Sequence, residues 1–239
     1  MSTVLTQVLT YAIFPAGAIL AGAALAALRA PGPTFRSAIQ HFAAGTVFSV
    51  LAVELLPDLM HRKLPLPTLI GFSLGVALML TLKWFGDKRE SASGGESTSG
   101  MVTAMGVDVG LDGVLIGLSF AAGAKQGLLL TFGLALEVFF LGVACATSLQ
   151  GNGKKWPVVA RTAGLLALII LAGAVAGAVI LNSVTAVYVD ALLAFGVAAL
   201  LYLVTEELLV EAHEGKETPL QAAMFFVGFI ALFMVDMLV

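Results

Sequence analysis

Eight long apolar stretches are the feature of this sequence that most restricts its fold. A helix needs about 20 predominantly apolar residues to cross the hydrocarbon core of a bilayer. Breaks at Gly, Pro and charged clusters leave eight stretches near that length, at about 4–29, 36–60, 66–85, 101–122, 126–149, 157–181, 186–211 and 218–238. The 239-residue chain is 59% hydrophobic and only 11% charged, unlike a soluble domain. We therefore expect an all-α integral membrane protein with eight transmembrane helices.

The connections between these stretches predict a single transmembrane domain over residues 1–239. All of them are short except the polar, Ser- and Gly-rich segment 87–100, which we expect to be a mobile loop. The first stretch lacks a convincing cleavage site, so we interpret it as a retained helix. No basic stripe indicates nucleic-acid binding, and the single cysteine, Cys145, excludes an internal disulfide.

The basic residues predict the orientation of the chain. Nine of the 12 Lys and Arg residues follow odd-numbered stretches, and three follow even-numbered ones. Because cytoplasmic loops carry the excess of basic residues, loops after odd-numbered stretches, including 87–100, should be cytoplasmic. Both termini should then lie outside. A multi-pass protein with such short loops is typical of a bacterial inner membrane.

Three acids near the middle of the bilayer predict a cation site. Asp108 and Asp112 share a helix face in the fourth stretch, about 10 and 16 Å along it, and Glu137 lies about 16 Å along the fifth. A charge at this depth costs roughly 2.5–3.5 kcal/mol on insertion scales. No Lys or Arg lies at that depth, and carboxylate oxygens are ligands for hard divalent cations. The alternative is that the acids are protonated and donate to backbone carbonyls.

Other polar residues are candidates for a transport path. Glu54 should lie toward the outer end of the second stretch, and Glu206 and Glu207 toward the inner end of the seventh. They could be stations for a moving cation, or carboxylates that extend into water. The candidate path residues are Glu54, Asp190, Glu206, Glu207, Glu211 and His213.

An internal repeat relates the second and seventh stretches. The segments FAAGTVFSVLAVELLPD (42–58) and FGVAALLYLVTEELLVE (195–211) align at a constant offset of 153, with Glu54 on Glu207. Because these stretches cross in opposite directions, they predict inverted repeats over 1–86 and 157–239 around a central helix pair, 101–149. Secondary transporters are often built this way, with the site near the midplane. Chance similarity between Leu-rich helices is the alternative.

These features together resemble the ZIP (Zrt-, Irt-like protein) family of divalent metal transporters. The resemblance is carried by the second stretch, which ends in Leu-Leu-Pro-acid, and by the seventh, which contains TEELLVEA (205–212). It implies a three-two-three helix arrangement and an elevator-like motion of the central helices. The family's fourth-helix motif His-Asn-x-Pro-Glu-Gly is replaced by DVGLDG (108–113), and its fifth-helix His-x-x-Pro-Glu-Gly by EVFFLG (137–142).

These replacements imply one metal site instead of the family's two, formed by Asp108, Asp112 and Glu137. We expect a transporter, not an enzyme, that moves Zn²⁺, Mn²⁺ or Fe²⁺ into the cytoplasm as its substrate, without a resident cofactor. A homodimer is compatible with this reading. The alternatives are a metal sensor or scaffold without transport, and an intramembrane hydrolase, for which the Gly-x-Gly-Asp and His-Glu-x-x-His motifs are absent.

Overall fold

The computed structural model of the chain describes residues 2–28, 32–92, 98–120, 123–183, 186–213 and 218–238. These residues form helices, and no strand occurs among them. Eight of the helical segments are long and apolar enough to cross a membrane. The predicted all-α fold with eight such segments is therefore confirmed, and it is the fold of a multi-pass membrane protein.

Six segments are single helices, and two are interrupted. The single helices are α1 (Ser2–Leu28), α4 (Pro65–Ala92), α5 (Thr98–Ser119), α6 (Ala124–Gly151), α7 (Trp156–Ser183) and α10 (Pro219–Leu238). The second segment consists of α2 (Pro33–Val50), the π-helical turn η1 (Leu51–Leu55) and α3 (Leu56–Arg62). The seventh consists of α8 (Ala186–Tyr202), the π-helical turn η2 (Leu203–Leu208) and α9 (Leu209–Ala212).

The predicted loop 87–100 is shorter than expected. Helix α4 continues to Ala92 and α5 begins at Thr98, while residues 93–97 lie outside the described residues. The segment KRESA (88–92) is polar but rich in residues with high helix propensity. Hydropathy therefore located the end of the apolar stretch and not the end of the helix.

The two π-helical turns lie at equivalent places in the second and seventh segments. In η1 the N–H of Leu56 donates to the carbonyl of Leu51, and in η2 the N–H of Leu209 donates to that of Val204. Each bond spans five residues, and the two bonds are 153 positions apart. Pro57, which follows η1, lacks the N–H that a regular helix would use, but no proline lies in or near η2.

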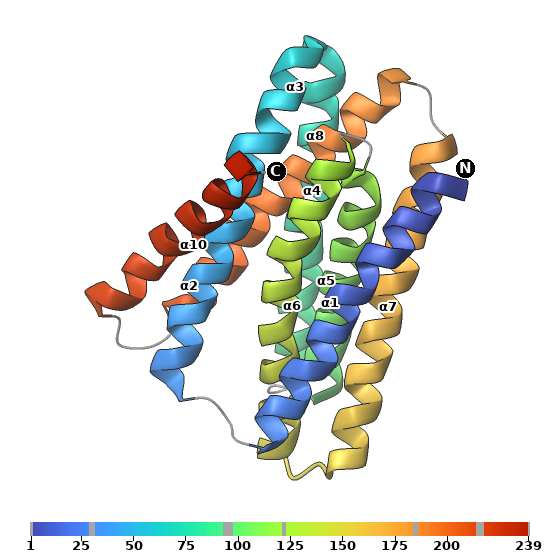
Figure 1. The fold of residues 1–239 in the computed structure, drawn as a ribbon. Helices are drawn as coiled ribbons and strands as arrows, with labels where there is room; N and C mark the ends of the chain where they lie inside the picture. The colour runs from blue at the N-terminus through green and yellow to red at the C-terminus, as the bar shows by residue number, and fades with distance from the viewer. Residues whose placement is uncertain are drawn as a thin grey trace.

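The helices associate in two groups of four segments. In the first, α1 packs along α6 and α7, and α5 packs along α7. In the second, α2 packs along α10, and α4 along α8. Figure 1 shows α1, α5, α6 and α7 side by side, with α2 and α10 at the left. We call the first group the site unit and the second the frame unit; they meet mainly where α2 contacts α6.

Glycines allow the closest helix approaches within each unit. A Cβ on Gly22 of α1 would lie 1.9 Å from the Phe139 carbonyl oxygen of α6. In the frame unit, a Cβ on Gly228 of α10 would lie 2.1 Å from the Phe42 carbonyl oxygen of α2. Small residues at helix interfaces let backbones come together in membranes. The same explanation holds for Gly113 of α5, where a Cβ would lie 2.3 Å from the Ile170 carbonyl oxygen of α7.

Candidate metal centre

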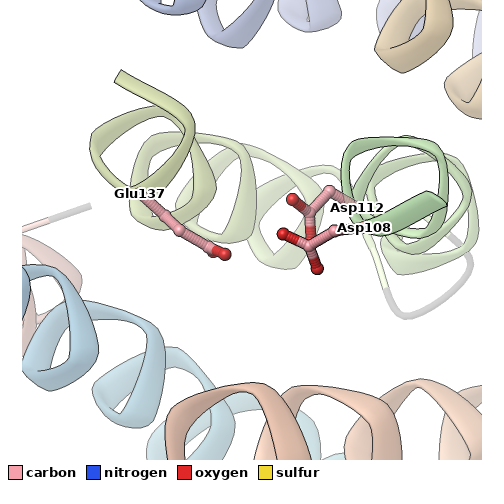
Figure 2. Close-up of side chains that lie close together, drawn as sticks. All are labelled: Asp108, Asp112 and Glu137. Carbon is pink, nitrogen blue, oxygen red and sulfur yellow. The ribbon is translucent and has the colours of Figure 1, made fainter. Parts of the chain in front are cut away.

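The structure brings together the three acids that the sequence singled out. Asp108 and Asp112 lie on α5 and Glu137 lies on α6, and the close-up in Figure 2 shows the three carboxyl groups converging between the two helices. One oxygen of each lies within 4.8 Å of the others. Two oxygens that bind one cation at about 2.1–2.6 Å are themselves about 3–5 Å apart. The spacing of the three side chains is therefore compatible with one divalent cation.

The burial of these carboxyl groups makes a positive charge favourable at the site. Asp112 is completely buried and Glu137 is 4% exposed, while Asp108 is half-buried. Within the described part of the chain, neither side-chain oxygen of Asp112 has a hydrogen-bond partner. A buried, unsatisfied carboxylate is costly. A bound cation or a proton would balance this charge, and the three carboxylates offer oxygen ligands for a cation.

A cavity connects the site to one end of the molecule. Its volume is about 340 Å³, and Asp108 and Glu137 line it together with Gln40 of α2 and Glu207 of η2. Its other wall residues are Ala43, Ala104, Met105, Phe140, Leu141, Ala144, Glu206, Leu208 and Val210. The lining residues belong to α2, the first half of α5, the later part of α6, η2 and α9, toward the lower end in Figure 1. Because Ala104 and Glu206 are exposed, the cavity reaches the protein surface there.

On the other side of the site, the path is closed by apolar side chains. The pocket found there has a volume of only about 10 Å³, which is room for one water at most. Leu55, Leu115 and Leu193 line it with Ser119 and Gly196, and the four side chains are at most 6% exposed. The carboxylate site is therefore reached from the lower end and closed from the upper end.

The candidate path residues occupy different parts of the molecule. Glu206 and Glu207 lie in η2 and line the cavity, and Glu207 is close enough to Asp112 to interact with it electrostatically. Glu206 also pairs with Lys83 at 2.9 Å. At the opposite end, Glu54 in η1 accepts a hydrogen bond from Gln126.

Asp190 and His213 are not among the described residues that line the cavity. Asp190 is fully buried and accepts a hydrogen bond from Thr68 Oγ1 at 2.9 Å, so it joins α8 to α4. His213 lies against His41, with ring centroids 5.0 Å apart. The side chain of Glu211 lies outside the described residues.

Sequence reasoning missed several polar residues that the structure places near these groups. Gln40 lines the cavity, and it lies near the start of the second apolar stretch. Lys125 and Asp236 pair at 2.9 Å at the upper end. A signal was present, because both residues lie near the outer ends of their stretches, at the depth expected for Glu54.

No protein-family model matches the chain, and no curated protein matches its sequence.

Proposed function

We propose that this protein is a ZIP-like transporter that carries a divalent cation across the membrane by alternating access. The observation that carries the proposal is the buried carboxylate cluster of Asp108, Asp112 and Glu137 at the inner end of a one-sided cavity. Three carboxylates in an apolar bundle form a site for a hard or borderline cation. A site accessible from one end only is what alternating access requires in one of its two states.

The packing of the frame unit supports inverted repeats. Gly228 approaches the carbonyl oxygen of Phe42, and Gly75 approaches that of Phe195. Gly75 and Gly228 are 153 positions apart, and so are Phe42 and Phe195. This is also the offset of the sequence repeat and of the two π-helical turns. Three independent features thus share one offset, which argues against chance similarity.

The site unit supports the same symmetry with its own offsets. Gly142 of α6 approaches the carbonyl oxygen of Ile19 in α1, and Gly113 of α5 approaches that of Ile170 in α7. The two glycines are 29 positions apart, and the two isoleucines are 151 positions apart. Asp108 and Glu137 are also 29 positions apart. The two proposed ligands therefore take equivalent places in the two helices of the central pair.

The cavity and the small upper pocket follow this repeat as well. Leu208 in the cavity corresponds to Leu55 in the pocket, and Ala43 corresponds to Gly196, both at the offset of 153. The two spaces are equivalent by the repeat but unequal in volume. If the site unit moved against the frame unit so that the upper pocket widened and the lower cavity closed, the site would become accessible from the opposite end. By the distribution of Lys and Arg, the open side is cytoplasmic.

The test is metal uptake by the full chain in liposomes, with Mn²⁺, Fe²⁺ and Zn²⁺ each supplied outside. We expect uptake by the native protein and its loss, by about tenfold or more, in Asp112→Asn, because the amide removes a charge from the ligand set. Asp58→Asn is the matched control, since Asp58 pairs with Arg62 away from the cavity, and it should leave uptake close to native.

Calorimetric titration of the same preparations separates transport from the alternatives. Metal binding that depends on Asp112 but produces no uptake would identify a sensor or scaffold. Equal binding and uptake by native protein and Asp112→Asn would show that the three acids are not the site.

A further inference from the structure

A group of charged and polar side chains joins the site unit to the frame unit at the upper end, opposite the cavity. Lys125, at the start of α6, has its Nζ 2.9 Å from Asp236 Oδ1 of α10 and 3.4 Å from Glu54 Oε1 of η1. The same Nζ donates to the Asp236 backbone carbonyl at 3.0 Å. Gln126 Nε2 donates to Glu54 Oε2 at 2.6 Å. We call these four residues the outer clamp.

The two carboxylates of the outer clamp are largely removed from solvent. The side chains of Glu54 and Asp236 are 11% and 15% exposed, and that of Lys125 is 37% exposed. Partly buried ion pairs are screened less by water and salt than pairs on the surface. Removing the cation from such a pair leaves uncompensated negative charges, which is costly. Separating α6 from η1 and α10 would take the Lys125 ammonium group away from the two carboxylates. The cost of leaving them without a cation therefore opposes this separation.

Two other ion pairs among the described residues do not have this effect, because both partners of each pair belong to the frame unit. Lys83 of α4 pairs with Glu206 of η2 at 2.9 Å. Arg62 and Asp58 pair within α3 at 2.9 Å. A movement of one unit against the other leaves these pairs intact, whereas it must break the contacts of Lys125.

We propose that Lys125 is a tethered cation that holds the upper path closed: its ammonium group occupies the Glu54–Asp236 acidic pair while the metal site faces the lower cavity. The outer clamp thereby stabilises the arrangement that is open to the lower cavity and lowers the population of the arrangement that is open at the upper end. The proposal rests on the proposed function, because it requires the site unit to move relative to the frame unit.

The test measures the reactivity of cysteines placed on the two sides of the site. In the full chain with Cys145→Ala, Ser119→Cys reports on the small upper pocket, and Ala144→Cys reports on the lower cavity, since these positions line them. Each is treated with a small membrane-permeant maleimide in liposomes. We expect Lys125→Ala to speed labelling at position 119 by about tenfold, equivalent to about 1.4 kcal/mol, and to slow labelling at position 144.

Lys83→Ala is the matched control, because it removes the same side chain from an ion pair of the same length within one unit. It should change both labelling rates by less than about twofold. Asp236→Asn keeps the size of its side chain and should shift the rates in the same direction as Lys125→Ala, so it tests the proposal if the alanine variant folds poorly. Unchanged rates in both clamp variants, or an equal change in the control, would overturn the proposal.

Metal uptake by the same liposomes distinguishes failure of the clamp from failure of the proposed function. Native uptake of Mn²⁺, Fe²⁺ or Zn²⁺ together with unchanged labelling in the clamp variants would show that the protein transports without a Lys125 clamp. Shifted labelling without uptake of any of the three ions would support the clamp and contradict transport.

Discussion

At the scale of single residues, the acids differ in how their charge is balanced. Glu54 and Asp236 pair with Lys125, and Glu206 pairs with Lys83. Asp112 has no hydrogen-bond partner among the described residues and is fully buried. A buried carboxylate without a partner is rare in proteins unless it has a functional reason. This difference distinguishes Asp112 from acids that only hold helices together.

The donor atoms of the site lead to a prediction about metal choice. Its three side-chain ligands are all oxygen donors, whereas imidazole suits zinc better than it suits manganese. We expect the native protein to transport Mn²⁺ or Fe²⁺ at least as readily as Zn²⁺. Asp108→His combined with Glu137→His should raise the ratio of Zn²⁺ to Mn²⁺ uptake by about tenfold, or about 1.4 kcal/mol in relative binding.

Uptake of each ion into liposomes, measured singly and in competition, checks this expectation. Asp58→His is the control for a histidine placed on the frame unit, away from the cavity. A native protein that strongly prefers zinc, with no change in the double variant, would contradict the proposed ligand set.

At the scale of helices, the closest approaches define which pairs move together. A Cβ on Gly113 would lie 2.3 Å from the carbonyl oxygen of Ile170, so α5 and α7 cannot keep their spacing with any larger residue there. We expect Gly113→Ala to destabilise the protein by about 1–3 kcal/mol through overpacking. Its thermal unfolding midpoint in detergent should fall by several degrees.

Gly164→Ala is the control for this prediction, because a Cβ on Gly164 of α7 meets no other atom within 4 Å. Alanine also has a higher helix propensity than glycine. The control should therefore unfold at or above the native temperature. Equal midpoints for both variants would show that α5 and α7 are not held at this distance.

The π-helical turns place the acids of the interrupted segments at the two ends of the path. Glu54 lies in η1 beside Lys125, and Glu207 lies in η2 on the cavity wall. π-Helical turns are rare and frequently occur at functional sites. Both turns are π-helical, although only η1 is followed by a proline. A proline alone therefore does not explain the shared geometry, which occurs at equivalent positions of the sequence repeat.

At the scale of the whole molecule, the nine-to-three distribution of basic residues predicts which end is cytoplasmic. In a Cys145→Ala background, Gly100→Cys at the exposed start of α5 should react with an impermeant maleimide only after intact cells are permeabilised. Met60→Cys in α3 is the control at the opposite end, where Met60 is 76% exposed. It should be labelled from outside.

The reverse labelling pattern would invert the orientation. The cavity would then face outward, and the proposed sites of Lys125 and Glu207 would exchange sides. The uptake experiment and the cysteine experiment on the outer clamp would remain valid, because they compare the two ends of the molecule without reference to the cell.

The amino-acid sequence by itself determined the eight apolar helices and the depth of the three central acids. Helix length in a bilayer depends on the local run of apolar residues, and the rise per residue then fixes how deep Asp108, Asp112 and Glu137 lie. The repeat offset of 153 was also readable, because both copies retain the Glu-Leu-Leu phrase. None of these properties requires knowledge of which helices are neighbours.

Only the tertiary structure decided that the cavity opens at one end and that Lys125 occupies the Glu54–Asp236 pair. The cavity is lined by residues of α2, α5, α6 and η2, and the contacts of Lys125 join α6 to η1 and α10, so both features bring together elements that are distant in the chain. The repeat places an acid near each end, Glu54 and Glu207, so it does not state which end is open. The physical reason is that accessibility depends on how whole helices are displaced, and that displacement is a property of the assembled bundle.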